Sequence, residues 1–148
     1  MNRTIAICTL VGWAALYAAL VACAPWTISD GNAFLKGFVN EEFLGFMGVV
    51  VTITLASAAN LYIELNKLED KLDEAAFQKS KSDVRHSAYA LIGTLVAAIL
   101  LVIVKPLLIE NERTMAFING VALTILLFAV MILIDLTQAA FSLDPRAD

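Results

Sequence analysis

Five polar residues lie near the ends of long apolar segments, where their types and spacing could support ion selection or a proton-controlled gate. Glu64 follows Asn60 by four residues, so a helix would place both on one face. Arg85 and His86 precede the third apolar segment, and Asp135 follows the fourth. Together they form a candidate inner-mouth polar cluster, acting as a cation-selecting acidic ring or titrating at the histidine. The alternative is that all five are interfacial residues that reach water.

The sequence contains no pattern typical of an enzyme, a cofactor site or a metal centre. A single histidine outside any HExxH pattern does not supply a zinc site. The glycines form no phosphate-binding loop, and no serine lies in a G-x-S-x-G context. The middle connection carries five basic and six acidic residues, an unfavourable balance for nucleic acid. We therefore predict a non-enzymatic protein without cofactor, metal or nucleic-acid ligand.

Composition indicates that these side chains are positioned by membrane helices. Of the 148 residues, 60% are hydrophobic and 16% charged, whereas about a quarter are charged in a soluble domain. The mean hydropathy is +0.81. The apolar excess lies in four blocks without charged side chains, 5–24, 43–63, 89–104 and 115–134.

A helix needs about 20 apolar residues to cross a hydrocarbon core of about 30 Å. The blocks are continuously apolar, unlike the alternating strands of a membrane barrel. We predict an all-α polytopic membrane protein, a four-transmembrane-helix bundle in which the second helix extends into the cytoplasm. Residues 1–148 form one membrane domain with spans at about 4–24, 43–65, 87–109 and 115–137. The third span reaches full length if Lys105 snorkels or faces protein.

The distribution of basic residues predicts the orientation in the membrane. Three basic residues lie in the two outer connections, Lys36, Lys105 and Arg113. The other seven precede the first block, occupy the middle connection or follow the fourth block. The positive-inside rule therefore places both termini and the middle connection in the cytoplasm.

The first apolar block allows two interpretations. Arg3, an apolar stretch and the run ending at Cys23 resemble a bacterial lipoprotein signal with its lipobox, in which case this cysteine would be lipidated. The stretch is longer than a typical signal and contains Trp13 and Tyr17, which favours a retained first helix. The resemblance also suggests a bacterial inner membrane.

A leucine face continues the second span beyond the predicted membrane. Leu61, Leu65, Leu68 and Leu72 recur at spacings of four, three and four, which predicts a cytoplasmic helical arm over about 66–82. A serine cap at 80 or 82 would then restart the third helix, leaving a short return. Because the two helices of such a hairpin differ in length, the leucine face would contact another subunit's arm, the membrane surface, a kinked fold-back of the chain or a partner protein.

These features support three functional hypotheses. The first is a non-enzymatic inner-membrane subunit that self-associates and couples to a partner through the arm, in the manner of a sensor or scaffold. The second is an oligomeric ion channel or membrane-permeabilising effector, such as those of bacterial defence systems. The third is an accessory subunit of a larger membrane complex. All have the lipid bilayer as a partner, and small residues on each span favour close helix packing. Asn60 and Asn119 would bond across helices or line a pore.

Overall fold

The computed structural model describes residues 3–69, 78–108 and 111–142, and every regular element in these ranges is a helix. In chain order they are α1 (Arg3–Cys23), η1 (Pro25–Thr27), α2 (Ala33–Phe38), α3 (Glu41–Glu69), α4 (Gln78–Val104), η3 (Lys105–Leu107) and α5 (Glu112–Ser142). Four helices are long and apolar enough to cross a membrane: α1, α3, α4 with η3, and α5. The prediction of an all-α fold with four such helices is confirmed.

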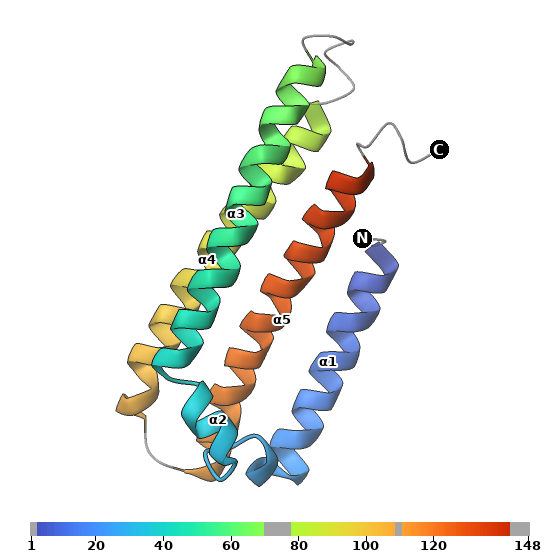
Figure 1. Ribbon diagram of the computed structural model, residues 1–148. Helices are drawn as coiled ribbons and strands as arrows, with labels where there is room; N and C mark the ends of the chain where they lie inside the picture. The colour runs from blue at the N-terminus through green and yellow to red at the C-terminus, as the bar shows by residue number, and fades with distance from the viewer. Residues whose placement is uncertain (1–2, 70–77, 109–110, 143–148) are drawn as a thin grey trace.

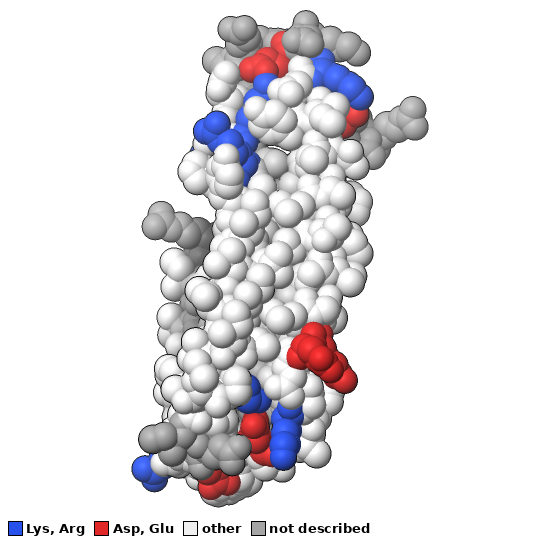
Figure 2. Space-filling view, turned by 90° about the vertical axis from the view of Figure 1, so that its left-hand side faces the viewer, with Lys and Arg blue, Asp and Glu red and all other residues white. Residues whose placement is uncertain are grey.

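The four long helices run side by side, and the molecule has two distinct ends (Figure 1). At the hairpin end lie the start of α1, the end of α3, the start of α4 and the end of α5. At the loop end lie η1, α2 and the connection from α4 to α5. Figure 2 shows that charged side chains gather at these two ends, with an uncharged belt between them on that face. This distribution fits a helix bundle with a hydrocarbon zone around its middle.

The core is built by α3, α4 and α5, which pack against one another. Buried positions in α3 follow spacings of four and three, as in Met47, Val51 and Thr54. On α5 the buried alanines Ala122 and Ala129 are seven residues apart. A repeat of about 3.5 residues is the pattern of helices that cross at a shallow angle, with side chains interlocking along the seam.

Helix α1 lies outside this core and contacts α5 through two hydrogen bonds. The Trp13 indole N–H donates to Thr124 Oγ1 at 2.8 Å, and the Tyr17 hydroxyl donates to the Phe117 carbonyl at 2.8 Å. Gly120 allows this approach, because a Cβ there would overlap the Tyr17 ring. The bundle therefore consists of a three-helix core, with α1 packed against the outside of α5.

The structure corrects the expected geometry of the arm. Helix α3 is described to Glu69 and α4 begins at Gln78, before the serines expected to cap it. The return helix is therefore longer than predicted, and the two helices meet through Lys81, which forms an ion pair with Glu69 and lies 5.9 Å from the centre of the Tyr62 ring. Residue 72 and the rest of 70–77 lie outside the described residues.

The leucine face is directed inward, toward the protein's own core. Leu61 and Leu65 are buried in the cluster that also contains Val84 of α4 and Leu136 of α5. Leu68 is half-buried. Of the alternatives for this face, a contact within the chain therefore accounts for Leu61 and Leu65.

Candidate functional site

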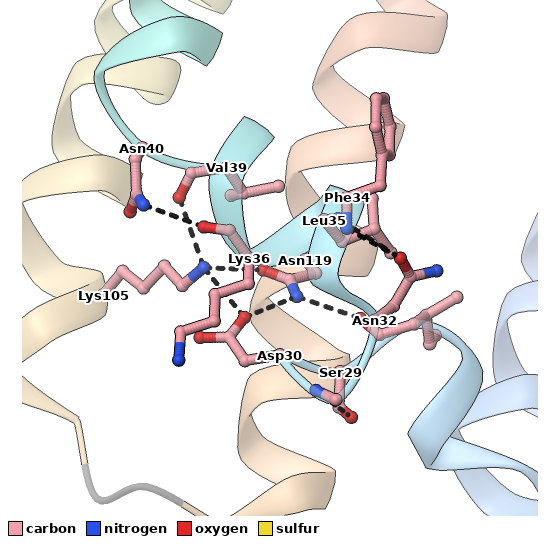
Figure 3. A network of polar contacts seen from close by, with 12 residues as sticks. Ser29, Asp30, Asn32, Phe34, Leu35, Lys36, Val39, Asn40, Lys105 and Asn119 are labelled. Atoms are coloured by element: carbon pink, nitrogen blue, oxygen red, sulfur yellow. Dashed lines mark hydrogen bonds and ion pairs between the residues drawn. The ribbon is translucent and has the colours of Figure 1, made fainter.

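The strongest concentration of buried polar groups lies at the loop end and centres on Lys105 (Figure 3). The Lys105 ammonium donates to Asp30 Oδ1 at 3.0 Å, to Asn119 Oδ1 at 3.1 Å and to the Val39 carbonyl at 3.2 Å. Its side chain is 7% exposed, and that of Asp30 is 29% exposed. Three acceptors for three N–H groups satisfy the ammonium fully, which is the condition for burying it.

Asn119 of α5 completes the network by using both ends of its amide. Its oxygen accepts from Lys105, while its nitrogen donates to Asp30 Oδ1 at 2.9 Å and to the Ile28 carbonyl at 3.0 Å. The side chain is fully buried. We call Lys105, Asp30 and Asn119, with the Val39 and Ile28 carbonyls, the loop-end network. It ties three separate segments of the chain together.

Local sequence explains how each member is positioned. Asp30 lies in the turn between η1 and α2, where the Gly31 N–H donates to the buried Ser29 hydroxyl at 3.2 Å. Val39 follows the last residue of α2, so no later helical turn occupies its carbonyl. Lys105 lies at the end of α4, immediately before Pro106, and a cation is favoured at a helix C-terminus.

The network also sets the protonation of Asp30, which lies in the connection between α1 and α3. Burial alone would raise the pKa of its carboxyl group. Hydrogen bonds from Asn119 and Lys105, together with the charges of Lys105 and Lys36, outweigh burial and hold that pKa below its ordinary value. Asp30 is therefore ionised at neutral pH, as a stable ion pair requires.

Two open hollows adjoin the network. One, of about 530 Å³, is bordered by Asp30, Lys36, Asn40 and Lys105. The other, of about 250 Å³, is bordered by Asp30, Lys36 and Glu112. Lys36 is exposed, so the hollows present mixed charge to solvent at the loop end. The charges of the Lys105 ammonium and the Asp30 carboxylate neutralise each other, because the two groups are in direct contact.

The five residues of the predicted inner-mouth cluster lie at the hairpin end and border different surfaces. Asn60 and Glu64 are exposed on α3, and Glu64 forms an ion pair with Lys67 at 2.7 Å. Arg85 borders a hollow of about 150 Å³ next to Tyr62 and Lys81.

The two remaining members of that cluster are placed separately. Asp135 borders another hollow, of about 380 Å³, beside Leu61, Leu65 and Asp83. His86 Nδ1 lies 2.8 Å from the Ser82 carbonyl oxygen on its own helix. Arg85 and Asp135 thus face different hollows, while Asn60 and Glu64 face outward.

Sequence reasoning missed Asp30 as a site residue and left Lys105 and Asn119 unconnected. The available signal was the lysine itself, because a cation at the end of an apolar segment needs an acceptor if it turns inward. The paired residues are 75 and 89 positions apart, so no local spacing identified Asp30. Over the described ranges, no three His, Cys, Asp or Glu side chains could together hold a metal ion.

Comparisons of the chain with protein-family models, with curated proteins and with solved structures found no match.

Proposed function

We propose that this chain is a non-enzymatic integral membrane subunit that couples to a partner protein through the hairpin formed by α3 and α4. The proposal places the hairpin and both termini in the cytoplasm of a bacterial cell, following the basic residues. The observation that carries it is the ordered projection of α3 and α4 beyond the other two long helices at the hairpin end (Figure 1).

The length of α3 supports the projection of the hairpin beyond the rest of the bundle. The 29 residues of α3 span about 43 Å at 1.5 Å per residue, against a hydrocarbon core of about 30 Å. Because α3 starts with Glu41 and Glu42 at the loop end, we place this surplus of about 13 Å, or more than two helical turns, in water at the hairpin end. Internal contacts hold these turns together, since Leu65 is buried and Lys81 joins Glu69. A preorganised hairpin loses little conformational entropy when a partner binds it.

The exposed face of the hairpin defines what a partner would contact. Glu64 and Lys67 form a solvent-facing pair with side chains 60% and 61% exposed. Leu61 and Leu65 are used inside the chain. We therefore place the partner contact at this charged pair, on a surface distinct from the leucine face.

Self-association remains part of the proposal and rests on a different surface. Helix α4 exposes Ile92, Val96, Ile99 and Ile103, at spacings of four, three and four. This stripe of β-branched residues suits a second copy of the helix. Replacing Val96 and Ile99 with alanine should reduce the mass of the solubilised particle in native mass spectrometry. An unchanged mass would remove this stripe as the contact.

The partner contact is tested by exchanging the charges of one surface pair. In the double variant Glu64→Lys with Lys67→Glu, the intrahelical pair is retained while the surface pattern is reversed. The matched control is Glu42→Lys, an exposed charge reversal at the other end of the same helix. Affinity purification from bacterial membranes should show a several-fold loss of the co-purifying protein in the exchanged variant alone. Equal recovery from both variants, or purification with no other protein, would refute coupling through the hairpin.

A further inference from the structure

A long apolar groove runs along the bundle between α1, α4 and α5. Its volume is about 760 Å³. Phe117 and Ile125 of α5 contribute to it, together with Trp13 of α1 and with Gly93 and Ala97 of α4. The groove exists because α1 packs on α5 and leaves the adjoining face of α4 uncovered.

The groove is a built feature of the fold. The hydrogen bonds from Trp13 to Thr124 and from Tyr17 to Phe117 fix α1 against α5. On the opposite wall, a Cβ added to Gly93 would meet no atom within 4 Å. Small residues on α4 therefore leave the space open, and hydrogen bonds hold α1 at its other side.

The length and the apolar lining of the groove indicate what kind of molecule it binds. From Phe117 to Ile132 it follows α5 for about 22 Å. Its lining is almost wholly apolar, from Leu10 of α1 to Ile132 of α5. A flexible hydrocarbon tail fits the 300–1,000 Å³ that is usual for small-molecule sites. The first ~15 Å lies within reach of a lipid tail anchored in the leaflet at the loop end.

Charge at the mouth of the groove identifies the headgroup. Arg113 precedes Phe117 by four residues and so continues the groove-lining row of α5 by one turn. It is exposed, and no ion pair of its side chain is recorded among the described residues. Long side chains in a helix lean toward its N-terminus, which for α5 lies at the loop end (Figure 1). Neighbouring Glu112 instead borders a loop-end hollow. A guanidinium in this position matches a phosphate group.

We propose that this groove binds one acyl tail of an anionic phospholipid, with the lipid phosphate on Arg113. The site rests on the proposed membrane insertion and is independent of the hairpin partner. A resident lipid would fill the unpacked face of α4 and complete the bundle.

Native mass spectrometry of the full chain in mild detergent tests this, with phosphatidylglycerol and phosphatidylcholine as probes. We expect preferential phosphatidylglycerol adducts, lost several-fold in Gly93→Leu, which fills the groove. The control is Gly45→Leu, another exposed helical glycine whose added Cβ meets nothing. Arg113→Gln should remove the preference between the two lipids. Equal adducts in both glycine variants, or loss of a dimer rather than of lipid in Gly93→Leu, would overturn the proposal.

A second measurement does not depend on any groove variant folding. With Trp26→Phe, Trp13 is the only tryptophan and lies in the groove. In nanodiscs, a minority of brominated-tail phosphatidylglycerol should quench its fluorescence more than the same fraction of brominated phosphatidylcholine. Equal quenching by the two lipids would contradict a site selective for the anionic headgroup, whatever the adduct pattern. Neither result depends on whether a protein partner co-purifies.

Discussion

Replacing Lys105 with methionine should strongly destabilise the fold, because it removes the cation at the centre of the loop-end network. Methionine keeps an unbranched side chain of similar length, so the change is mainly electrostatic. It leaves the Asn119 oxygen and the Val39 carbonyl without their donor. Among the described residues, it also leaves the Asp30 carboxylate with the Asn119 amide as its one side-chain donor.

The size of the effect follows from burial. Removing one partner of a buried ion pair costs about 3–5 kcal/mol. Asp30 is 29% exposed and retains one donor, which lowers the cost. We expect the free energy of unfolding to fall by about 2–3 kcal/mol. Lys36→Met is the matched control, because this lysine is exposed in the same region, and its effect should stay within about 0.5 kcal/mol.

Removing the other charge of the pair, by Asp30→Asn, should lower the free energy of unfolding more than Lys105→Met does. It keeps the shape and an acceptor oxygen, but it leaves an ammonium whose side chain is only 7% exposed without a counter-charge. We expect a loss of about 3–5 kcal/mol. Because the two residues are in direct contact, the double variant should be less destabilised than the sum, with a coupling of about 1–3 kcal/mol.

The assay is equilibrium unfolding in mixed micelles by added sodium dodecyl sulfate, followed by far-ultraviolet circular dichroism. Lys105→Met, Lys36→Met, Asp30→Asn and the double variant would be measured under identical conditions. If Lys105→Met were no more destabilising than Lys36→Met, the ion pair would not hold the fold. Strictly additive single variants would also refute the reasoning, because they would show that the two side chains act independently.

Three further predictions concern other parts of the molecule. The lowered pKa of Asp30 stabilises the fold above its unfolded value of about 3.9, so this contribution should be lost as pH falls through the lower folded pKa. The acid-induced loss should be smaller in Asp30→Asn, measured by the same unfolding assay. Gly120→Ala should displace Tyr17 and loosen α1, costing about 1–3 kcal/mol and changing tryptophan fluorescence; an unchanged spectrum and stability would contradict the contact. Leu65→Ala should cost about 2–5 kcal/mol without changing particle mass, and more than Leu68→Ala. A loss of oligomer with unchanged stability would instead mean that the leucine face joins two chains.

The long helices could be predicted because their signal is local. Four apolar blocks of sufficient length identify four helices, and their spacing also revealed the leucine face of α3. The predicted start of α4 was two to four residues too late. Ser80 and Ser82 are good capping residues, but the helix already begins at Gln78. Packing against α3 and the Lys81–Glu69 pair therefore outweigh the local capping preference.

The loop-end network could not be predicted from spacing, because its side chains meet only after folding. Asp30 lies in a short turn, which on its own indicates a connection. One of the two alternatives for Asn119, a bond across helices, agrees with its hydrogen bond to Lys105, but its partners were not identified. A buried lysine demands acceptors, and several polar residues in the connections could have supplied them. The choice of Asp30 depends on how η1 and the turn that follows it pack against the N-terminal part of α5.

The network and the groove are linked through the rotation of α5. Asn119 is held on one side of this helix by Lys105, Asp30 and the Ile28 carbonyl. Phe117 and Val121, two positions before and after it, line the groove on another side. Two residues along a helix correspond to about 200° of rotation, so fixing Asn119 inward directs these residues outward. The buried polar cluster thus does more than close one end of the bundle: it orients the surface against which α1 docks. Disrupting it should alter the groove as well as the stability of the loop end.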